Sequence, residues 1–328
     1  MTSSLQSPLE TDLPVIDISQ FAQEIEGDHL QYHPEVVKLR KACEEWGFFR
    51  LVNHGVPQDL LQKVLSVSKD LVSMPMEVKD RVTTSTPAES YVRAPGIPTT
   101  FETFCFLDMP NPDSILEISR KIWPEEGNAN FCEAMGALSL HLSDLAQRII
   151  KLILASLGLD VETFCHSDFE KCIAILRINS YSSHGKSIGE VVLTPHADPG
   201  CLTILHTDEK EGLEVRTKEG NWINIKHSPN SLIVNLGDSL KVWSNGKYWS
   251  AVHRVISKGW ENRLSVPFFY NFAGDTQISA PEVLVSEDNA RRYKPFIFSE
   301  LQSEMRKGLR NYKADGEQVK VMERLAAI

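Results

Sequence analysis

Two histidines and one aspartate in this sequence have the spacing of a metal site. His196 and Asp198 stand two positions apart in a segment typical of a β-strand, where residues i and i+2 point to the same side. A second histidine, His253, lies on a later predicted strand. Two imidazoles and one carboxylate form the facial set of ligands that holds non-haem Fe(II) and leaves positions open for co-ligands, and the same donors also suit Zn²⁺.

A second pair of residues has the chemistry of an anion site. Arg263 and Ser265, ten residues past His253, again stand two positions apart on one predicted strand. A guanidinium beside a hydroxyl is suited to a carboxylate. The ordinary alternative is a strand arginine in a surface ion pair. A histidine and an aspartate at this spacing often occur by chance, so the prediction depends on both pairs together.

The elements that must position these residues change in kind along the chain. Before residue 170 the pattern is mixed, with strands predicted over 13–18 and 48–52 and helices over 35–46, 59–73 and 135–157. Residues 82–130 are rich in Pro, Thr, Gly and Asn, which predicts an irregular segment. From 172 to 272, short β-rich runs with turn signals between them predict a barrel or sandwich, and helical character returns afterwards. We therefore divide the chain into regions 1–170, 171–275 and 276–328.

Composition indicates a globular protein that acts on small molecules. Of the 328 residues, 42 % are hydrophobic and 24 % are charged, and the net charge of −10 argues against nucleic acid or an anionic membrane as a partner. The sequence shows neither a leader pattern nor an apolar run of about 18 residues. The six cysteines form no CxxC pair, so we expect reduced thiols. These features predict a monomeric, cytoplasmic protein.

The motifs and their order along most of the chain resemble the plant-type 2-oxoglutarate/Fe(II)-dependent dioxygenase family. The resemblance implies a mainly β fold with flanking helices, in which a double-stranded β-helix, or jelly roll, follows an N-terminal mixed region. One departure is that Ser182 replaces the proline that follows the family's tyrosine. The matching motifs include Trp46-Gly-Phe-Phe49, Val52-Asn-His-Gly-Val-Pro57, Arg177-Ile-Asn-Ser-Tyr181, His196-Ala-Asp198, Val234-Asn-Leu-Gly-Asp238, His253-Arg-Val255 and Arg263-Leu-Ser265.

The resemblance also implies a cofactor, co-substrates and roles for individual residues. Fe(II), 2-oxoglutarate and O₂ would take part, with ascorbate in support, and a C–H bond of a small molecule would be oxidised with release of succinate and CO₂. The residues that match the family's iron ligands are His196, Asp198 and His253. Those that match its 2-oxoglutarate site are Arg263, Ser265 and Tyr181 at the distal carboxylate, with Asn179 nearby.

Strand parity extends the site to a candidate substrate pocket. If Arg263 and Ser265 face the barrel interior, Phe269 and Asn271 share their face, and an inward Tyr181 brings Arg177 with it. An inward arginine needs an anionic partner, so we predict that Arg177 receives a carboxylate of the substrate. The alternatives are an internal acid or a place at the barrel mouth. The other candidate pocket residues are Phe104 and Phe106, for which a core position is the alternative.

Several functions remain open at this level. The segments 91–95 and 101–108 loosely resemble the auxin-oxidising branch, which favours a carboxylic acid such as an auxin as substrate. A gibberellin oxidase or a specialised-metabolite hydroxylase or desaturase is the alternative within the family. Outside it, a zinc hydrolase would leave Arg263, Ser265 and Tyr181 unexplained, and a non-catalytic small-molecule binder would keep only the barrel.

Overall fold

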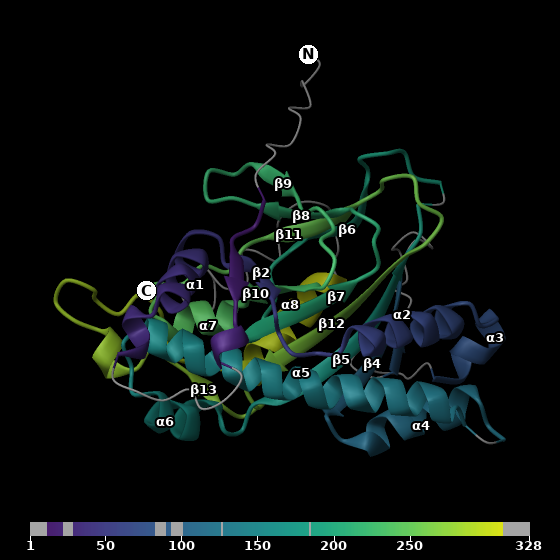
Figure 1. Cartoon of the computed structure of the whole chain (residues 1–328), viewed down its shortest axis with the longest axis horizontal. Coiled ribbons are helices and arrows are strands. Elements are labelled where there is room, and N and C mark those ends of the chain that lie inside the picture. Colours follow the sequence, from purple (N-terminus) through teal and green to yellow (C-terminus); the bar gives the residue numbers. More distant parts are fainter. Residues whose placement is uncertain are drawn as a thin grey trace, which may run out of the picture.

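The computed structural model describes residues 12–21, 29–82, 90–92, 101–125, 127–183 and 185–310. Two sheets form a double-stranded β-helix, which confirms the predicted fold (Figure 1). In order across the sheet, the eight-stranded one contains β1 (Val15–Asp17), β2 (Phe48–Val52), β10 (Ser231–Leu236), β7 (Leu202–Thr207), β12 (Arg263–Asn271), β5 (Ile173–Tyr181), β4 (Phe101–Met109) and β3 (Ser90–Val92). The four-stranded one contains β6 (Val191–His196), β11 (His253–Ile256), β8 (Leu213–Arg216) and β9 (Trp222–Asn224), and β13 (Gln277–Ile278) pairs with β14 (Phe296–Ile297).

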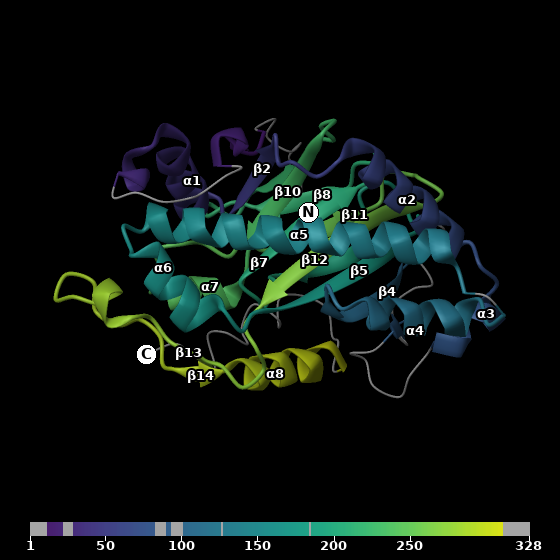
Figure 2. The same cartoon turned by 60° about the horizontal axis from the view of Figure 1, so that its bottom comes forward.

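Helices cover the outer face of the large sheet. The long helix α5 (Ala129–Ser156) runs along this face, with α1 (Pro34–Glu45), α2 (Gln58–Val72) and α4 (Pro112–Ile122) beside it (Figure 2). The Asn128 side chain caps its first turn, and Gly158, with φ at +73°, follows its last. The remaining α-helices of the described residues are α3 (Met76–Lys79), α6 (Val161–Phe164), α7 (Asp238–Trp243) and α8 (Phe298–Arg310). No helix in the described part of the chain is both long and apolar enough to cross a membrane.

Alternation along the strands separates a helix-covered core from the barrel interior. Leu176 and Ile178 on β5, Ile204 on β7 and Phe268 on β12 are fully buried in the cluster that also contains the inner face of α5. Residues of the opposite parity face the four-stranded sheet. The two sheets therefore enclose one set of side chains while the helices bury the other, and the polar site residues belong to the enclosed set.

The prediction that residues 82–130 are irregular is wrong for most of the described part of this segment. Residues 90–92 form β3, residues 101–109 form β4, which lies between β3 and β5 in the large sheet, and residues 112–122 form α4. The strand places Phe104 and Phe106 on one face and Thr103 on the other. The Asn111 side chain accepts the N–H of Asp113 and so begins α4. The Pro and Asn residues that suggested irregular structure therefore mark the turn between two regular elements.

Candidate active site

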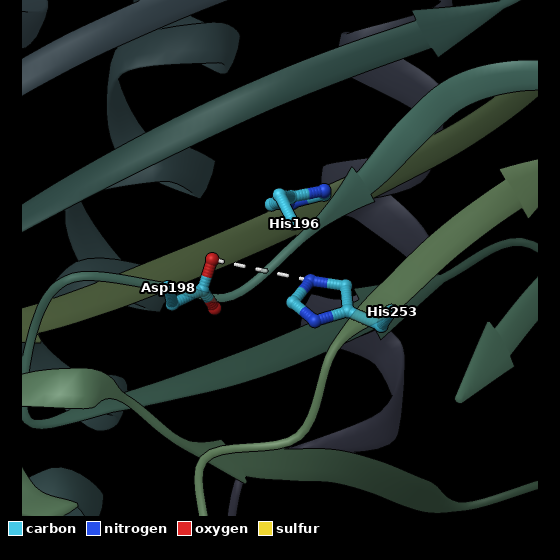
Figure 3. A group of neighbouring side chains, drawn as sticks. All are labelled: His196, Asp198 and His253. Atoms are coloured by element: carbon cyan, nitrogen blue, oxygen red, sulfur yellow. Dashed lines mark ion pairs between the residues drawn. The ribbon is translucent and has the colours of Figure 1, made fainter. Parts of the chain in front are cut away.

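The three candidate metal ligands converge at the ends of two paired strands. His196 is the last residue of β6 and His253 the first of β11, and the two lie directly opposite each other in the antiparallel ladder. Asp198 lies in the turn after β6, just past the strand on which it was predicted. One ligand atom from each residue lies within 4.8 Å of the others, and Asp198 Oδ1 is 3.9 Å from His253 Nε2. All three side chains point toward a common space (Figure 3).

Backbone carbonyls orient both imidazole rings for metal binding. His196 Nδ1 lies 2.8 Å from the carbonyl oxygen of Thr194, and His253 Nδ1 lies 3.3 Å from that of Ala251. Because a carbonyl only accepts, each Nδ1 carries a proton, which leaves each Nε2 as the ring atom available to a metal. Burial, together with the neighbouring His253, lowers the pKa of His196 to about 4. The ring is therefore neutral, which is the form that binds a metal.

Two residues that the sequence did not single out hold the aspartate. The Thr203 hydroxyl and the Asn235 amide both donate to Asp198 Oδ2, at 2.6 and 2.7 Å, which leaves Oδ1 toward the histidines. Burial by itself would raise the pKa of Asp198, but the two histidines and these two donors keep it below its usual value. Strand parity was the one sequence signal that could have identified these two donors, because both are buried polar residues on the inward faces of β7 and β10.

Close backbone packing supports the turn that carries Asp198. Its carbonyl accepts the N–H of Asp238, at 2.8 Å, at the start of α7. A Cβ at Gly237 would lie 2.2 Å from the carbonyl oxygen of Gly200, so only glycine fits there. A Cβ at Gly200 would lie 1.9 Å from the Asn271 amide oxygen. Asn271 therefore shares the inward face, as predicted, but it packs against this turn.

The predicted co-substrate residues form one buried hydrogen-bonded group. Arg263 pairs with Tyr181, and Ser265 with Asn179, across β12 and β5. The Tyr181 hydroxyl lies 3.3 Å from Ser265 Oγ and accepts the Asn179 amide at 3.2 Å. Arg263 is only 2 % exposed, and its guanidinium carbon lies 5.2 Å from the centre of the Tyr181 ring.

This group lacks a partner that a bound carboxylate would supply. Among the described residues, no acceptor reaches the buried Arg263 Nη1. Asn179 Oδ1 is also buried without a partner there, but it needs a donor, which a carboxylate does not provide. An unpaired buried N–H of a charged group is costly. A carboxylate beside Arg263 would remove that cost, so the residues present fit 2-oxoglutarate, just as the two imidazoles and the carboxylate fit Fe(II).

The parity prediction for the pocket holds on β5 and β12. The pairing of these strands keeps one register from Arg263 to Asn271, without a bulge. The guanidinium carbon of Arg177 lies 5.2 Å from the centre of the Phe269 ring, so both side chains share the inward face. Arg177 Nε is buried without a partner among the described residues. The charge of Arg177 also contributes to the lowered pKa of His196, which places this arginine near the triad.

The prediction that Phe104 and Phe106 line the pocket is wrong. They pair with Ile178 and Leu176, whose side chains face the helices, and both rings are fully buried. The Phe106 ring centre lies 5.9 Å from that of Phe131 on α5. Their neighbour Phe101 has the opposite parity and lies 5.2 Å from the Tyr181 ring, at the barrel interior. Strand parity therefore divides the aromatic residues of β4 between the core and the site.

Family models match both halves of the chain. The 2OG-Fe(II) oxygenase superfamily matches residues 172–272, and the N-terminal region described as "non-haem dioxygenase in morphine synthesis" matches residues 13–126. Jasmonate-induced oxygenase 4 of Arabidopsis thaliana is 34 % identical over 93 % of this chain and 85 % of the relative. Gibberellin 3-beta-dioxygenase 1 of Pisum sativum is 28 % identical over 91 % of this chain and 78 % of the relative.

Solved structures agree with this assignment. The rice dioxygenase for auxin oxidation has a TM-score of 0.78 and 28 % identity, covering 96 % of this chain and all of its own. The Arabidopsis thaliana dioxygenase for auxin oxidation 1, in a complex with 2-oxoglutarate, has a TM-score of 0.74 and 30 % identity, covering 85 % of this chain and all of its own. JOX2 in complex with 2OG, Fe and JA has a TM-score of 0.75 and 28 % identity, with 90 % of this chain and 85 % of its own covered. The chain belongs to the plant-type 2-oxoglutarate/Fe(II)-dependent dioxygenase family.

Proposed function

We propose that this dioxygenase oxidises a C–H bond of a small carboxylic acid whose carboxylate binds Arg177. His196, Asp198 and His253 hold Fe(II), and Arg263, Ser265 and Tyr181 hold the distal carboxylate of 2-oxoglutarate. The observation that carries the substrate class is the buried Nε of Arg177, which lacks a partner on the inward face, near His196. An inward guanidinium in this position favours an anionic substrate over a neutral one.

Each residue has a role that follows from its position. Bound iron supplies the activation of O₂. His196 and His253 present their Nε2 atoms, and Asp198 presents Oδ1 because Thr203 and Asn235 occupy the other oxygen. Arg263 fixes one end of 2-oxoglutarate, and Arg177, stacked on Phe269, orients the acid so that one of its C–H bonds faces the metal.

An auxin is the acid that we propose first. Two of the solved structures similar to this chain are described as dioxygenases for auxin oxidation, and the rice one covers 96 % of the chain. A gibberellin is the alternative, because gibberellin 3-beta-dioxygenase 1 is a relative over 91 % of the chain. Substrate-dependent release of succinate, measured across a panel of auxins, gibberellins and neutral plant metabolites, distinguishes these substrates. Turnover of neutral compounds alone would contradict the proposal.

Replacing Arg177 with leucine tests the carboxylate contact. A hydrogen bond to a charged group contributes about 1.5–3 kcal/mol, so kcat/KM for the acid should fall about 10–100-fold. For the methyl ester of the same acid, which lacks the charge, kcat/KM should fall much less. Arg216→Leu, at an exposed position of β8, is the matched control and should leave kcat/KM unchanged for both substrates. Equal losses of kcat/KM for the acid and the ester would contradict a contact between Arg177 and the substrate carboxylate.

A further inference from the structure

A cavity lies between α2 and one end of the barrel, and none of the three metal ligands lines it. Its volume is about 290 Å³, and its lining includes none of His196, Asp198, His253, Tyr181 and Ser265. It opens between α2 and the segments 209–213 and 225–231. Exposed polar residues form its rim and buried apolar residues form its floor. The rim includes Gln58, Gln62 and His227, and the floor includes Leu213, Ile225 and Ile233.

Two buried arginines line this cavity, and neither has its full set of hydrogen bonds. Arg50 is 3 % exposed and donates to Ser231 Oγ at 3.0 Å and to the Lys226 carbonyl at 2.8 Å. The carboxylate that pairs with it, Asp12 at 3.4 Å, is 61 % exposed. Among the described residues, nothing accepts from Arg50 Nε, whereas the free Nη1 of the second arginine, Arg263, is the atom already assigned to 2-oxoglutarate. Arg50 therefore brings to the walls a buried positive charge whose paired carboxylate is largely exposed.

The other charged side chains that line the cavity are equal in number of each sign, so they do not cancel the charge of the two arginines. Lys210 and Lys226 add positive charge, and Glu209 and Glu211 add negative charge. One oxygen of Glu211 is already occupied, because it accepts the Asn224 amide at 2.8 Å. A cavity with apolar walls, two buried guanidiniums and a polar rim suits a ligand with an apolar body and an anionic group. We propose that it is a second binding site for a small organic carboxylate.

The second site shares Arg263 with the active site. Arg263 lines the cavity, donates from Nε to the Lys210 carbonyl at 3.0 Å in the cavity wall, and stacks on Tyr181 at the active site. A carboxylate in the cavity therefore changes the affinity for 2-oxoglutarate, and 2-oxoglutarate changes the affinity for that carboxylate by the same factor. This coupling rests on the proposed function, whereas binding in the cavity does not.

Calorimetric titration with 1-naphthoate tests the site. The full-length Arg177→Leu protein is used, so that the substrate contact is already removed. Leu65→Trp fills the cavity from α2, Gln62→Glu adds a negative charge at its rim, and Ser66→Glu adds the same charge on α2 outside it. We expect one bound naphthoate, weakened about tenfold or more by Leu65→Trp and severalfold by Gln62→Glu, and unchanged by Ser66→Glu. The neutral analogue 1-naphthamide should bind about tenfold more weakly.

Two results would overturn the second site. One is the absence of binding at millimolar naphthoate, and the other is a Kd that neither Leu65→Trp nor Gln62→Glu alters. Binding that appears only when Arg177 is intact would assign the acid to the substrate pocket and also overturn the second site. Naphthoate that binds in the cavity without changing the Kd of 2-oxoglutarate would overturn the coupling through Arg263 and leave the binding site intact.

Discussion

Replacing Thr203 with valine tests how Asp198, the proposed carboxylate ligand of the metal, is held. Valine keeps the shape of the side chain but removes the hydroxyl that donates to Asp198 Oδ2 at 2.6 Å. A hydrogen bond to a charged acceptor contributes about 1.5–3 kcal/mol, and each 1.4 kcal/mol is about tenfold in affinity. Because Asn235 still donates to the same oxygen, we expect the lower part of this range, a loss of about tenfold in Fe(II) affinity.

The assay is an anaerobic titration of the metal-free protein with Fe(II), in competition with a coloured chelator. Thr103→Val is the matched control, because Thr103 is also buried on an inward face and its hydroxyl donates, at 3.4 Å, to the Phe104 carbonyl. Thermal unfolding of both variants establishes that each one folds. Fe(II) affinity that is unchanged in Thr203→Val, or equally reduced in Thr103→Val, would refute the role of Thr203.

Three further predictions concern the co-substrate, the core and pH. Arg263→Lys should raise KM for 2-oxoglutarate about tenfold in succinate-release assays and change KM for the main substrate little; equal changes would indicate a general structural defect. Phe106→Ala should lower the free energy of unfolding in urea by about 3–5 kcal/mol and leave KM for the main substrate unchanged. A raised KM with unaltered stability would indicate that Phe106 lines the substrate pocket after all. Burial lowers the pKa of His206 from 6.5 to about 4, so the fold favours its neutral form, and the stability that this residue contributes is complete above pH 6.5 and lost as the pH falls toward 4. The loss is up to about 3 kcal/mol, and His206→Gln, which can still donate to the Leu61 carbonyl, should show a flatter pH profile in urea unfolding; identical profiles would contradict this.

The residues on β5 and β12 could be predicted because spacing along a strand determines which face a side chain occupies. Arg263 and Ser265 have the same parity, and so do Arg177 and Tyr181. A continuous register between the two strands then brings both pairs to one side. For the metal site the three predicted residues converge, but for a slightly different reason, since Asp198 lies in the turn beyond β6 and not on the strand.

The residues that sequence reasoning missed or misplaced could be assigned only with knowledge of which strands are neighbours. A single sequence does not show which strands pair. Thr203 and Asn235 reach Asp198 from β7 and β10, which are adjacent in the sheet although many residues separate them in the sequence. Phe104 and Phe106 could be assigned to a face only once β4 was known to pair with β5. The same information distinguishes an aromatic residue in the core from one in the pocket.

The proposed site binds Fe(II) and 2-oxoglutarate together, and a visible absorption spectrum measures this without any knowledge of the substrate. Fe(II) is added to the metal-free protein under anaerobic conditions, followed by 2-oxoglutarate. We expect a charge-transfer band in the wild-type protein and none in a folded His253→Ala variant, which lacks one of the three proposed ligands. The absence of the band in the wild-type protein, or an undiminished band in His253→Ala, would contradict the proposed iron site.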